Sequence, residues 1–454
     1  MLAMPRTPRE GPAQAVIWVA GCAVLLGAAA WLLPAFLPGL IVALLAFCGV
    51  ALAWRHLIAF WVAWLLVAGL SLEMALTDLF GPDAFQLTIA AVKGAEIGLV
   101  ALTIFRAGLV GDLLNPAFGF VWIAAAGLVT GMHPELTQLD MLRSLAGSIT
   151  PFLVFFCVKP AGWGAAIRTA VSYVPLLSVA LGLCLDLAGL RPVAFESGGL
   201  RLAGLGHPAF LAGVCLPAIY AGLLRWLHTA SWRVALLLGL NFIILILTGA
   251  RAPLAYASFV VVSSLILVPD AATPRAHRLV LAAAGIAAVP VLLILGQAYS
   301  SFRLFEIVAD EAGNLSGRDL LWPAFEAAAA RAPWFGWGLG SGNFIIPHTS
   351  QLAELLGTWA AHNEYLRIQV EGGHVGRTLL ILLFVLWTVF HTRRLERLER
   401  LVMRLIFVAF AAHAVTDNVL ISTPACVFFA FAAAVFAEPD ETASNRLRVT
   451  PHVA

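Results

Sequence analysis

Long, uninterrupted apolar runs recur from one end of this 454-residue chain to the other. A helix needs about 20 apolar residues to cross the roughly 30 Å hydrocarbon core of a bilayer. In lipid only helices and closed barrels satisfy their own backbone polar groups, and barrel strands alternate apolar with polar residues. The runs here do not alternate, and only 11% of the residues are charged. The sequence therefore predicts an all-α polytopic membrane protein.

Apolar stretches bounded by proline, glycine or charge give the predicted spans. They cover 15–33, 36–54, 57–76, 87–105, 118–132, 145–158, 169–190, 209–227, 234–249, 254–268, 279–298, 375–390, 401–415 and 419–436. Some are short enough to be half-membrane pieces, so we expect about twelve to fourteen crossings. The predicted organisation is a transmembrane bundle over 1–298, a cap over 299–374, C-terminal transmembrane helices over 375–437 and a tail over 438–454.

Basic residues are distributed unevenly between the two sides that alternating spans would create. If the N-terminus lies inside, most arginines fall on one side, including the run Arg393, Arg394, Arg397 and Arg400. The opposite short loops hold only Arg143, Arg191, Arg201 and Arg251. Cytoplasmic loops carry the excess of Lys and Arg. We therefore expect both termini and the tail to be cytoplasmic and the 299–374 connection to face the other side.

The 299–374 connection is too long for a plain linker, because loops beyond about 15 residues are usually functional or carry structure of their own. Ser316 and Asp319 resemble a capping box that begins a helix running through Ala330. A glycine-rich turn over 334–343 follows. A second helix is predicted from about Ser350 to Glu371, ending at the glycine pair 372–373. The sequence predicts a small helical cap.

Three arginines on the outward side are candidates for binding an anion. They are Arg201, Arg251 and Arg318, and neither Arg201 nor Arg251 has an acidic neighbour in sequence. An arginine at a membrane boundary also reaches simply to the headgroups, which is an equally good explanation for any one of them. Guanidinium binds phosphate through two parallel hydrogen bonds, so the three together favour a site for a lipid-borne pyrophosphate.

His362 is the candidate proton acceptor, within the segment TWAAHNEYLRIQVEGG of the predicted second cap helix. Histidine exchanges a proton near neutral pH, although a structural role is the commoner one for a helical histidine. Asp417, at the outward end of the last hairpin, is a candidate partner for His362 or for one of the arginines. Asp78 and Asp83 share an outward loop, but two carboxylates in a turn are usually just solvated, so no metal site is predicted.

Other features exclude whole classes of function. All six cysteines lie inside apolar segments without a CxxC pair, which predicts neither a zinc site nor a disulfide framework. No basic stripe with interleaved aromatics indicates nucleic-acid binding. A Walker loop and a Rossmann glycine pattern are also missing from the sequence, so no nucleotide cofactor is predicted.

The segment His362-Asn363, followed after nine residues by Gly373-His374-Val375-Gly376, matches the signature of bacterial O-antigen ligases. Arg201 with Leu205 matches the RxxxL motif of the same family. The likeness extends through LTGARAP, SGRDLLWPAF and PWFGWGLGSGNF, so it covers roughly 195–380. The N-terminal spans add only hydropathy. The chain thus resembles the O-antigen ligase and polymerase family.

The resemblance implies transfer of an O-antigen glycan from undecaprenyl pyrophosphate to a sugar hydroxyl of lipid A-core. The reaction would occur at the periplasmic face of the inner membrane. It implies a membrane-embedded GT-C glycosyltransferase that inverts the anomeric carbon and needs neither metal nor cofactor. His362 would be the catalytic base, and Arg201, Arg251 and Arg318 would hold the pyrophosphate. Asp417 and Asn363 would support them.

Two other functions compete with this interpretation. A protein O-oligosaccharyltransferase or an O-antigen polymerase uses the same type of donor, and only the acceptor separates them from a ligase. Protein-modifying relatives tend to carry a further region, whereas only 437–454 follow the last predicted span, which favours the ligase. A transporter of lipid-linked glycans would often show repeated halves with broken helices, and no convincing repeat is visible.

Overall fold

The computed structural model describes residues 48–437 except 197–198, 270, 299–317 and 357. The predicted span 15–33, most of 36–54, the start of the cap with Ser316, and the tail 438–454 lie outside the described residues. The chain divides into two units, 1–60 and 61–454.

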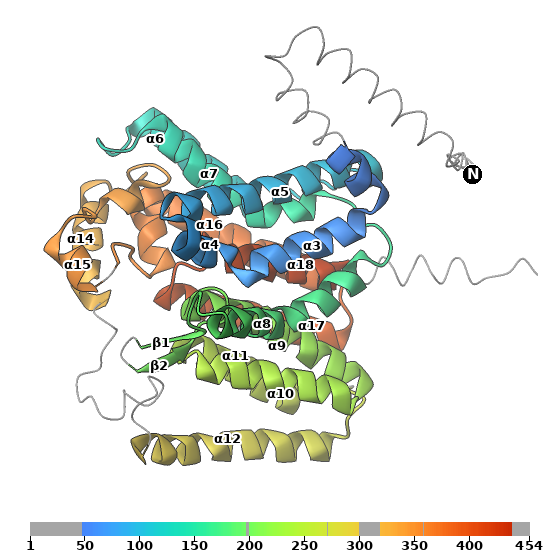
Figure 1. The fold of residues 1–454 in the computed structure, drawn as a ribbon. Coiled ribbons are helices and arrows are strands. Elements are labelled where there is room, and N and C mark those ends of the chain that lie inside the picture. The colour runs from blue at the N-terminus through green and yellow to red at the C-terminus, as the bar shows by residue number, and fades with distance from the viewer. Residues whose placement is uncertain (1–47, 197–198, 270, 299–317, 357, 438–454) are drawn as a thin grey trace, which may run out of the picture. The chain divides into compact units, whose positions relative to one another are not determined.

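Helices supply nearly all of the regular structure in the described residues (Figure 1). In chain order they are α3 (Leu57–Leu70), α4 (Leu72–Phe80), α5 (Asp83–Ala107), α6 (Ala117–Thr130), α7 (Gln138–Leu153), α8 (Trp163–Leu187), α9 (Pro208–Thr229), α10 (Trp232–Leu247), α11 (Arg251–Leu267), α12 (Arg275–Ala298), α14 (Arg318–Arg331), α15 (Gln351–Leu356), α16 (Glu364–Thr392), α17 (Arg397–Thr416) and α18 (Thr423–Phe436). Two short 3-10 turns are η2 (Val154–Phe156) and η3 (Ser341–Phe344). The strands β1 (Ala194–Glu196) and β2 (Leu200–Leu202) form an antiparallel hairpin.

The lengths and apolar composition of these helices confirm an all-α polytopic membrane protein. Five candidate spans are present among the described residues: 83–107, 138–156, 163–187, 208–229 and 364–392. The bent pair Cys48–Arg55 and Leu57–Leu70 makes a sixth, and four further apolar helices are shorter. Since the first predicted spans lie outside the described residues, the number of twelve to fourteen crossings stays a prediction.

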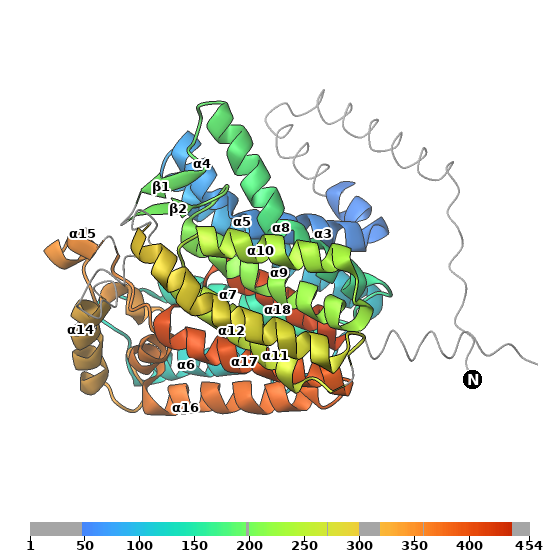
Figure 2. The same cartoon turned by 90° about the horizontal axis from the view of Figure 1, so that it is seen from below.

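Helix α9 forms the centre of the bundle. In its apolar stretch 78% of the residues are buried, against 22% in the stretch of α16. Helices α8, α10, α11 and α18 pack around α9, and Figure 2 shows them together from below. A helix that is apolar and buried all round belongs in a core, whereas one with an exposed apolar face meets lipid. Helix α16 is thus at the periphery of the bundle, packed on α6, α14 and α17.

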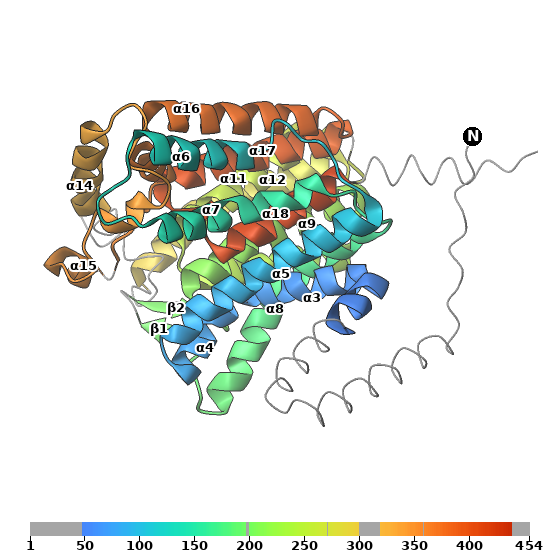
Figure 3. The same cartoon turned by 90° about the horizontal axis from the view of Figure 1, so that it is seen from above.

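One end of the bundle carries a small accessory structure, which we call the cap end. It comprises the β1–β2 hairpin, residues 318–356 and the segment 358–364 that leads into α16. Figures 1, 2 and 3 all show the hairpin, α14 and α15 at this end. The cap has a hydrophobic core of its own, in which Leu321 and Phe325 of α14 meet Ala353 of α15 and Val370 of α16.

The predicted second cap helix over 350–371 is wrong in one respect, because the structure breaks it. Helix α15 ends at Leu356 and α16 begins only at Glu364, so His362 lies between two helices and not on one. Asn363 begins the new helix, since its side-chain oxygen accepts a hydrogen bond from the Leu366 N–H at 3.1 Å. Asparagine is among the preferred residues at this capping position. The first cap helix matches better, because α14 ends at Arg331, next to the predicted Ala330.

Candidate functional site

His362 is held in an unusual backbone conformation just before α16. Its φ is +46°, in the left-handed region that few residues with a side chain adopt. The preceding residue is fixed twice: Ala361 is buried in the core of the cap, and its carbonyl accepts a hydrogen bond from the Trp322 indole at 2.9 Å. Strained conformations of this kind persist only where the surroundings impose them, and they cluster at functional sites.

The His362 ring contacts a carboxylate from a different helix. Its Nδ1 lies 3.0 Å from Asp417 Oδ1, and its Nε2 lies 3.0 Å from Thr358 Oγ1. Asp417 directly follows the last residue of α17, and its Oδ1 also accepts the Asn418 N–H at 2.8 Å. When Nδ1 donates its proton to the carboxylate, Nε2 is left as the acceptor. The side chains are 27% and 37% exposed, so a substrate can reach the pair.

Asn363 contributes to the candidate site by fixing the start of α16. Because its amide oxygen caps α16 by accepting from Leu366, the residue fixes where the helix starts relative to His362. The first turns of that helix are then held by buried charges: Arg367 pairs with Glu364 and, at 2.7 Å, with Glu371. Sequence reasoning missed this trio, although opposite charges three and four residues apart on one helix were a visible signal.

The glycines of the His362 signature allow two close approaches. Gly373 interrupts α16 with φ +62°, and a Cβ there would lie 2.3 Å from the Trp334 carbonyl oxygen. A Cβ on Gly376 would lie 2.9 Å from the Ile123 side chain of α6. The His374 N–H also donates to the Pro333 carbonyl at 2.7 Å. The signature therefore joins the glycine-rich turn of the cap, the kink in α16 and the neighbouring helix α6.

Arg201 lies on the hairpin at the cap end, beside the turn that precedes α11. Its Nε donates to the Thr248 carbonyl at 2.9 Å. Leu205 of the same motif is buried, and its carbonyl accepts from Arg191 at 2.6 Å. Arg191 in turn pairs with Asp78 at 2.5 Å. The buried Arg191 thus anchors the loop after Arg201, and Asp78 forms an ion pair with Arg191.

Arg251 is the first residue of α11, and this helix packs along α17. The Tyr256 hydroxyl donates to the Ala412 carbonyl at 3.0 Å, which ties the start of α11 to the last turns of α17 before Asp417. Arg318 is the first residue of α14 in the cap. The structure thus brings His362 and Asp417 into contact and places Arg201 next to the turn before Arg251, while the Arg318 side chain is outside what is described.

A comparison with protein families finds a match whose extent overlaps the resemblance noted in the sequence. Residues 234–381 match the model of the family described as O-Antigen ligase, which is about a third of the chain. The matched segment contains Arg251, Arg318 and His362, whereas Arg201 and Asp417 lie outside it. No curated protein matches the chain. Residues 234–381 are therefore similar to the O-antigen ligase family, which confirms the resemblance recognised in the sequence.

Proposed function

Given the O-antigen ligase domain at residues 234–381, we propose that this membrane protein is a glycosyltransferase of the ligase type. It transfers an O-antigen glycan from undecaprenyl pyrophosphate to a sugar hydroxyl of lipid A-core. The cap end faces the periplasm, the termini face the cytoplasm, and the membrane is the bacterial inner membrane. The distribution of arginines along the sequence supports this orientation.

The observation that carries the proposal is the contact between His362 and Asp417 at the cap end. A base must have its acceptor nitrogen free to meet the substrate, and a group that fixes its tautomer. Asp417 meets the second need by binding Nδ1. Thr358 is compatible with the need for an accessible acceptor nitrogen. Its hydroxyl donates to Nε2 while the ring is neutral and accepts from Nε2 once the ring is protonated.

The reaction follows from these positions. The acceptor hydroxyl oxygen attacks the anomeric carbon of the donor sugar, and its proton passes to His362 Nε2. The bond between that carbon and the pyrophosphate oxygen breaks, and its electron pair leaves with undecaprenyl pyrophosphate. Because the displacement occurs once and from the opposite face, the anomeric configuration inverts. Asp417 stabilises the imidazolium that forms, as a carboxylate does in other His-based sites.

The leaving group needs stabilisation of negative charge more than it needs a proton. Arg201, Arg251 and Arg318 are our candidates, because each lies in or next to the cap end and guanidinium groups suit phosphate oxygens. They act by position and charge, so the proposed reaction requires no metal and no cofactor.

Reconstitution of the purified protein with undecaprenyl-pyrophosphate glycan tests this function. We expect product with lipid A-core as acceptor, in the presence of a chelator, and none with a peptide acceptor. Glycan attached only to protein would identify an oligosaccharyltransferase instead, and elongation of the donor glycan alone would identify a polymerase. Movement of donor across a vesicle membrane without any transfer would replace the enzyme with a transporter.

A further inference from the structure

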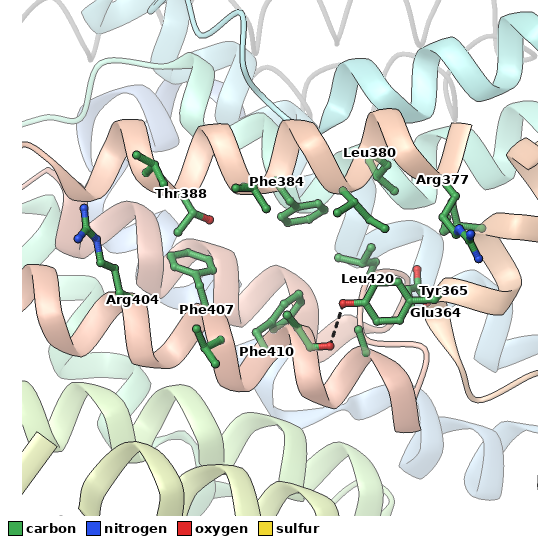
Figure 4. A pocket seen from close by; sticks show the side chains of 17 residues that line it. Glu364, Tyr365, Arg377, Leu380, Phe384, Thr388, Arg404, Phe407, Phe410 and Leu420 are labelled. Atoms are coloured by element: carbon green, nitrogen blue, oxygen red, sulfur yellow. Dashed lines mark hydrogen bonds between the residues drawn. The ribbon is translucent and has the colours of Figure 1, made fainter. Parts of the chain in front are cut away.

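A groove of about 490 Å³ runs between α16 and α17 (Figure 4). Its floor on α16 is a single stripe that includes Leu380, Phe384 and Thr388, at the three- and four-residue spacing of one helix face. Phe407 and Phe410 line it from α17. From Arg377 to Thr388 the stripe extends along about 16 Å of helix axis. The groove therefore follows the helices through roughly half of the hydrocarbon thickness.

The two ends of the groove are polar and its middle is apolar. At the cap end the Tyr365 hydroxyl donates to the Ala411 carbonyl at 3.0 Å and so bridges the two helices. Arg377 lies beside this bridge in Figure 4. At the other end Arg404 donates to Thr392 at 3.2 Å. A molecule that fills the groove must have a long apolar body and a polar head.

Arg377 and Arg404 differ in what already binds them. Arg404 contacts Thr392, and the nearby Arg367 is occupied by Glu364 and Glu371. For Arg377, which is partly buried, the described part of the chain gives no ion pair or hydrogen bond. A guanidinium at the mouth of an apolar groove, at a membrane boundary, suits an anionic lipid head.

The mouth of the groove adjoins the candidate site. Glu364 and Tyr365, which line it, directly follow His362 and Asn363. Leu420 lines the same end and is three residues from Asp417. A lipid whose chain lies in the groove therefore has its head next to the His362–Asp417 pair.

We propose that this groove binds the polyprenyl chain of the lipid-linked donor, and that Arg377 contacts the phosphate nearest to the lipid. The inference rests on the proposed function for the identity of the lipid. One stripe from each of two helices forms a channel for one chain, which suits a single-chain carrier and not an acceptor with several acyl chains. Arg377 thus joins Arg201, Arg251 and Arg318 in holding the pyrophosphate.

Binding of radiolabelled undecaprenyl pyrophosphate to the full-length protein in detergent tests the proposal. Val385 lines the groove and is 54% exposed, whereas Leu386 is 42% exposed on the same helix and does not line it. We expect Val385→Trp and Arg377→Gln to weaken binding about 10-fold or more, because one blocks the channel and the other removes a charged contact. Leu386→Trp and Arg143→Gln are the matched controls and should bind as wild type does.

A second measurement guards against misfolding of the tryptophan variant. A photoreactive phenylalanine at position 385 should crosslink to undecaprenyl pyrophosphate, and the same residue at position 386 should not. Unchanged binding by both Val385→Trp and Arg377→Gln, or displacement of the label by phosphatidylglycerol, would overturn the proposal. If binding follows the groove but the wild type transfers no glycan, the groove stands and the proposed function fails. Transfer with an unchanged donor KM in both variants overturns the groove alone.

Discussion

Helix α16 has a histidine–aspartate pair at each end, and the two pairs differ in their surroundings. At the cap end, His362 Nδ1 lies 3.0 Å from Asp417. At the far end, His391 Nε2 lies 3.1 Å from Asp112, where Trp387 also donates to the same carboxylate oxygen at 2.9 Å. The side chains are 27% and 37% exposed in the first pair, but 14% and 4% in the second.

The difference shows that the same two residue types serve different purposes. His391 stacks on Phe436 with ring centroids 5.1 Å apart, and its side chain is mostly covered. Burial raises the pKa of Asp112, but the hydrogen bonds and charge of its partners outweigh burial and hold that pKa below its usual value. The far pair fastens α16 to the loop before α6. The cap pair is open and strained, which suits chemistry.

The substitution His362→Ala should have the largest effect on glycan transfer. We expect glycan transfer to fall about 1000-fold, because a positioned general base contributes on the order of 10²- to 10⁴-fold. The apparent melting temperature in detergent should stay near that of wild type, since the ring is partly exposed. Wild-type turnover by this variant would make His362 a structural residue and remove the contrast between the two pairs.

Asp417→Asn should have a smaller effect of the same kind. Asparagine keeps the shape of the side chain but loses the charge that stabilises the imidazolium, so we expect transfer to fall about 10- to 100-fold. A change confined to kcat, with the donor KM unaltered, is the signature of this role. A rise in KM alone would instead assign Asp417 to donor binding.

Asp112→Ala should act on stability and spare the chemistry. It leaves the Trp387 and His391 donors without their acceptor, at a cost of about 2–4 kcal/mol. Thermal unfolding in detergent should show a lower melting temperature, while transfer per folded molecule stays within about 3-fold of wild type. Loss of activity without loss of stability would give the far pair a functional role as well.

The stability that the Asp112 contacts provide depends on pH, because they lower the pKa of Asp112. Stability from a depressed carboxylate is present above its ordinary pKa of about 4 and is lost as the pH falls through the folded-state value. The difference in melting temperature between wild type and Asp112→Asn should therefore be constant from neutral pH to about pH 5 and shrink only below pH 4. A difference that shrinks between pH 7 and 6 would contradict this assignment.

The substitution Thr358→Val should have the smallest effect on glycan transfer. Its hydroxyl contacts His362 Nε2, the nitrogen that accepts the proton in the proposed reaction, so under that proposal the hydroxyl is displaced or shared. We expect a change in transfer rate below about 5-fold in either direction. A loss as large as that of His362→Ala would mean that Thr358 is itself part of the proton path.

The sequence predicted the class of fold well, and it singled out His362, whose role as the base stays a prediction. Continuous apolar runs predicted some helices within a few residues, as for 209–227 against Pro208–Thr229. Others differ more, since the predicted span 375–390 is only the later part of Glu364–Thr392 and the predicted span 57–76 is broken between Leu70 and Leu72. The spacing between His362 and the later glycines identified the family, because that spacing reflects the fixed distance along α16 to its kink at Gly373. From the sequence, either His362 or one of the arginines was a possible partner for Asp417, and only the fold shows the contact with His362.

Other features depend on contacts far apart in the chain and had no local signal. The helical periodicity around His362 concealed a break, at which Asn363 caps α16 and the Trp322 indole of another helix binds the Ala361 carbonyl. The pairing of Arg191 with Asp78 joins residues more than a hundred positions apart. The groove beside Arg377 forms between α16 and α17, so no pattern local to Arg377 in the sequence indicates it.

The most direct test of His362 as the base is chemical rescue. Glycine adopts a positive φ without strain, so His362→Gly should preserve the backbone at +46° and leave space for a small molecule. We predict that added imidazole restores transfer in His362→Gly in proportion to its concentration, and leaves His391→Gly unchanged. Full activity of His362→Gly without imidazole, or equal stimulation of both variants, would contradict the account.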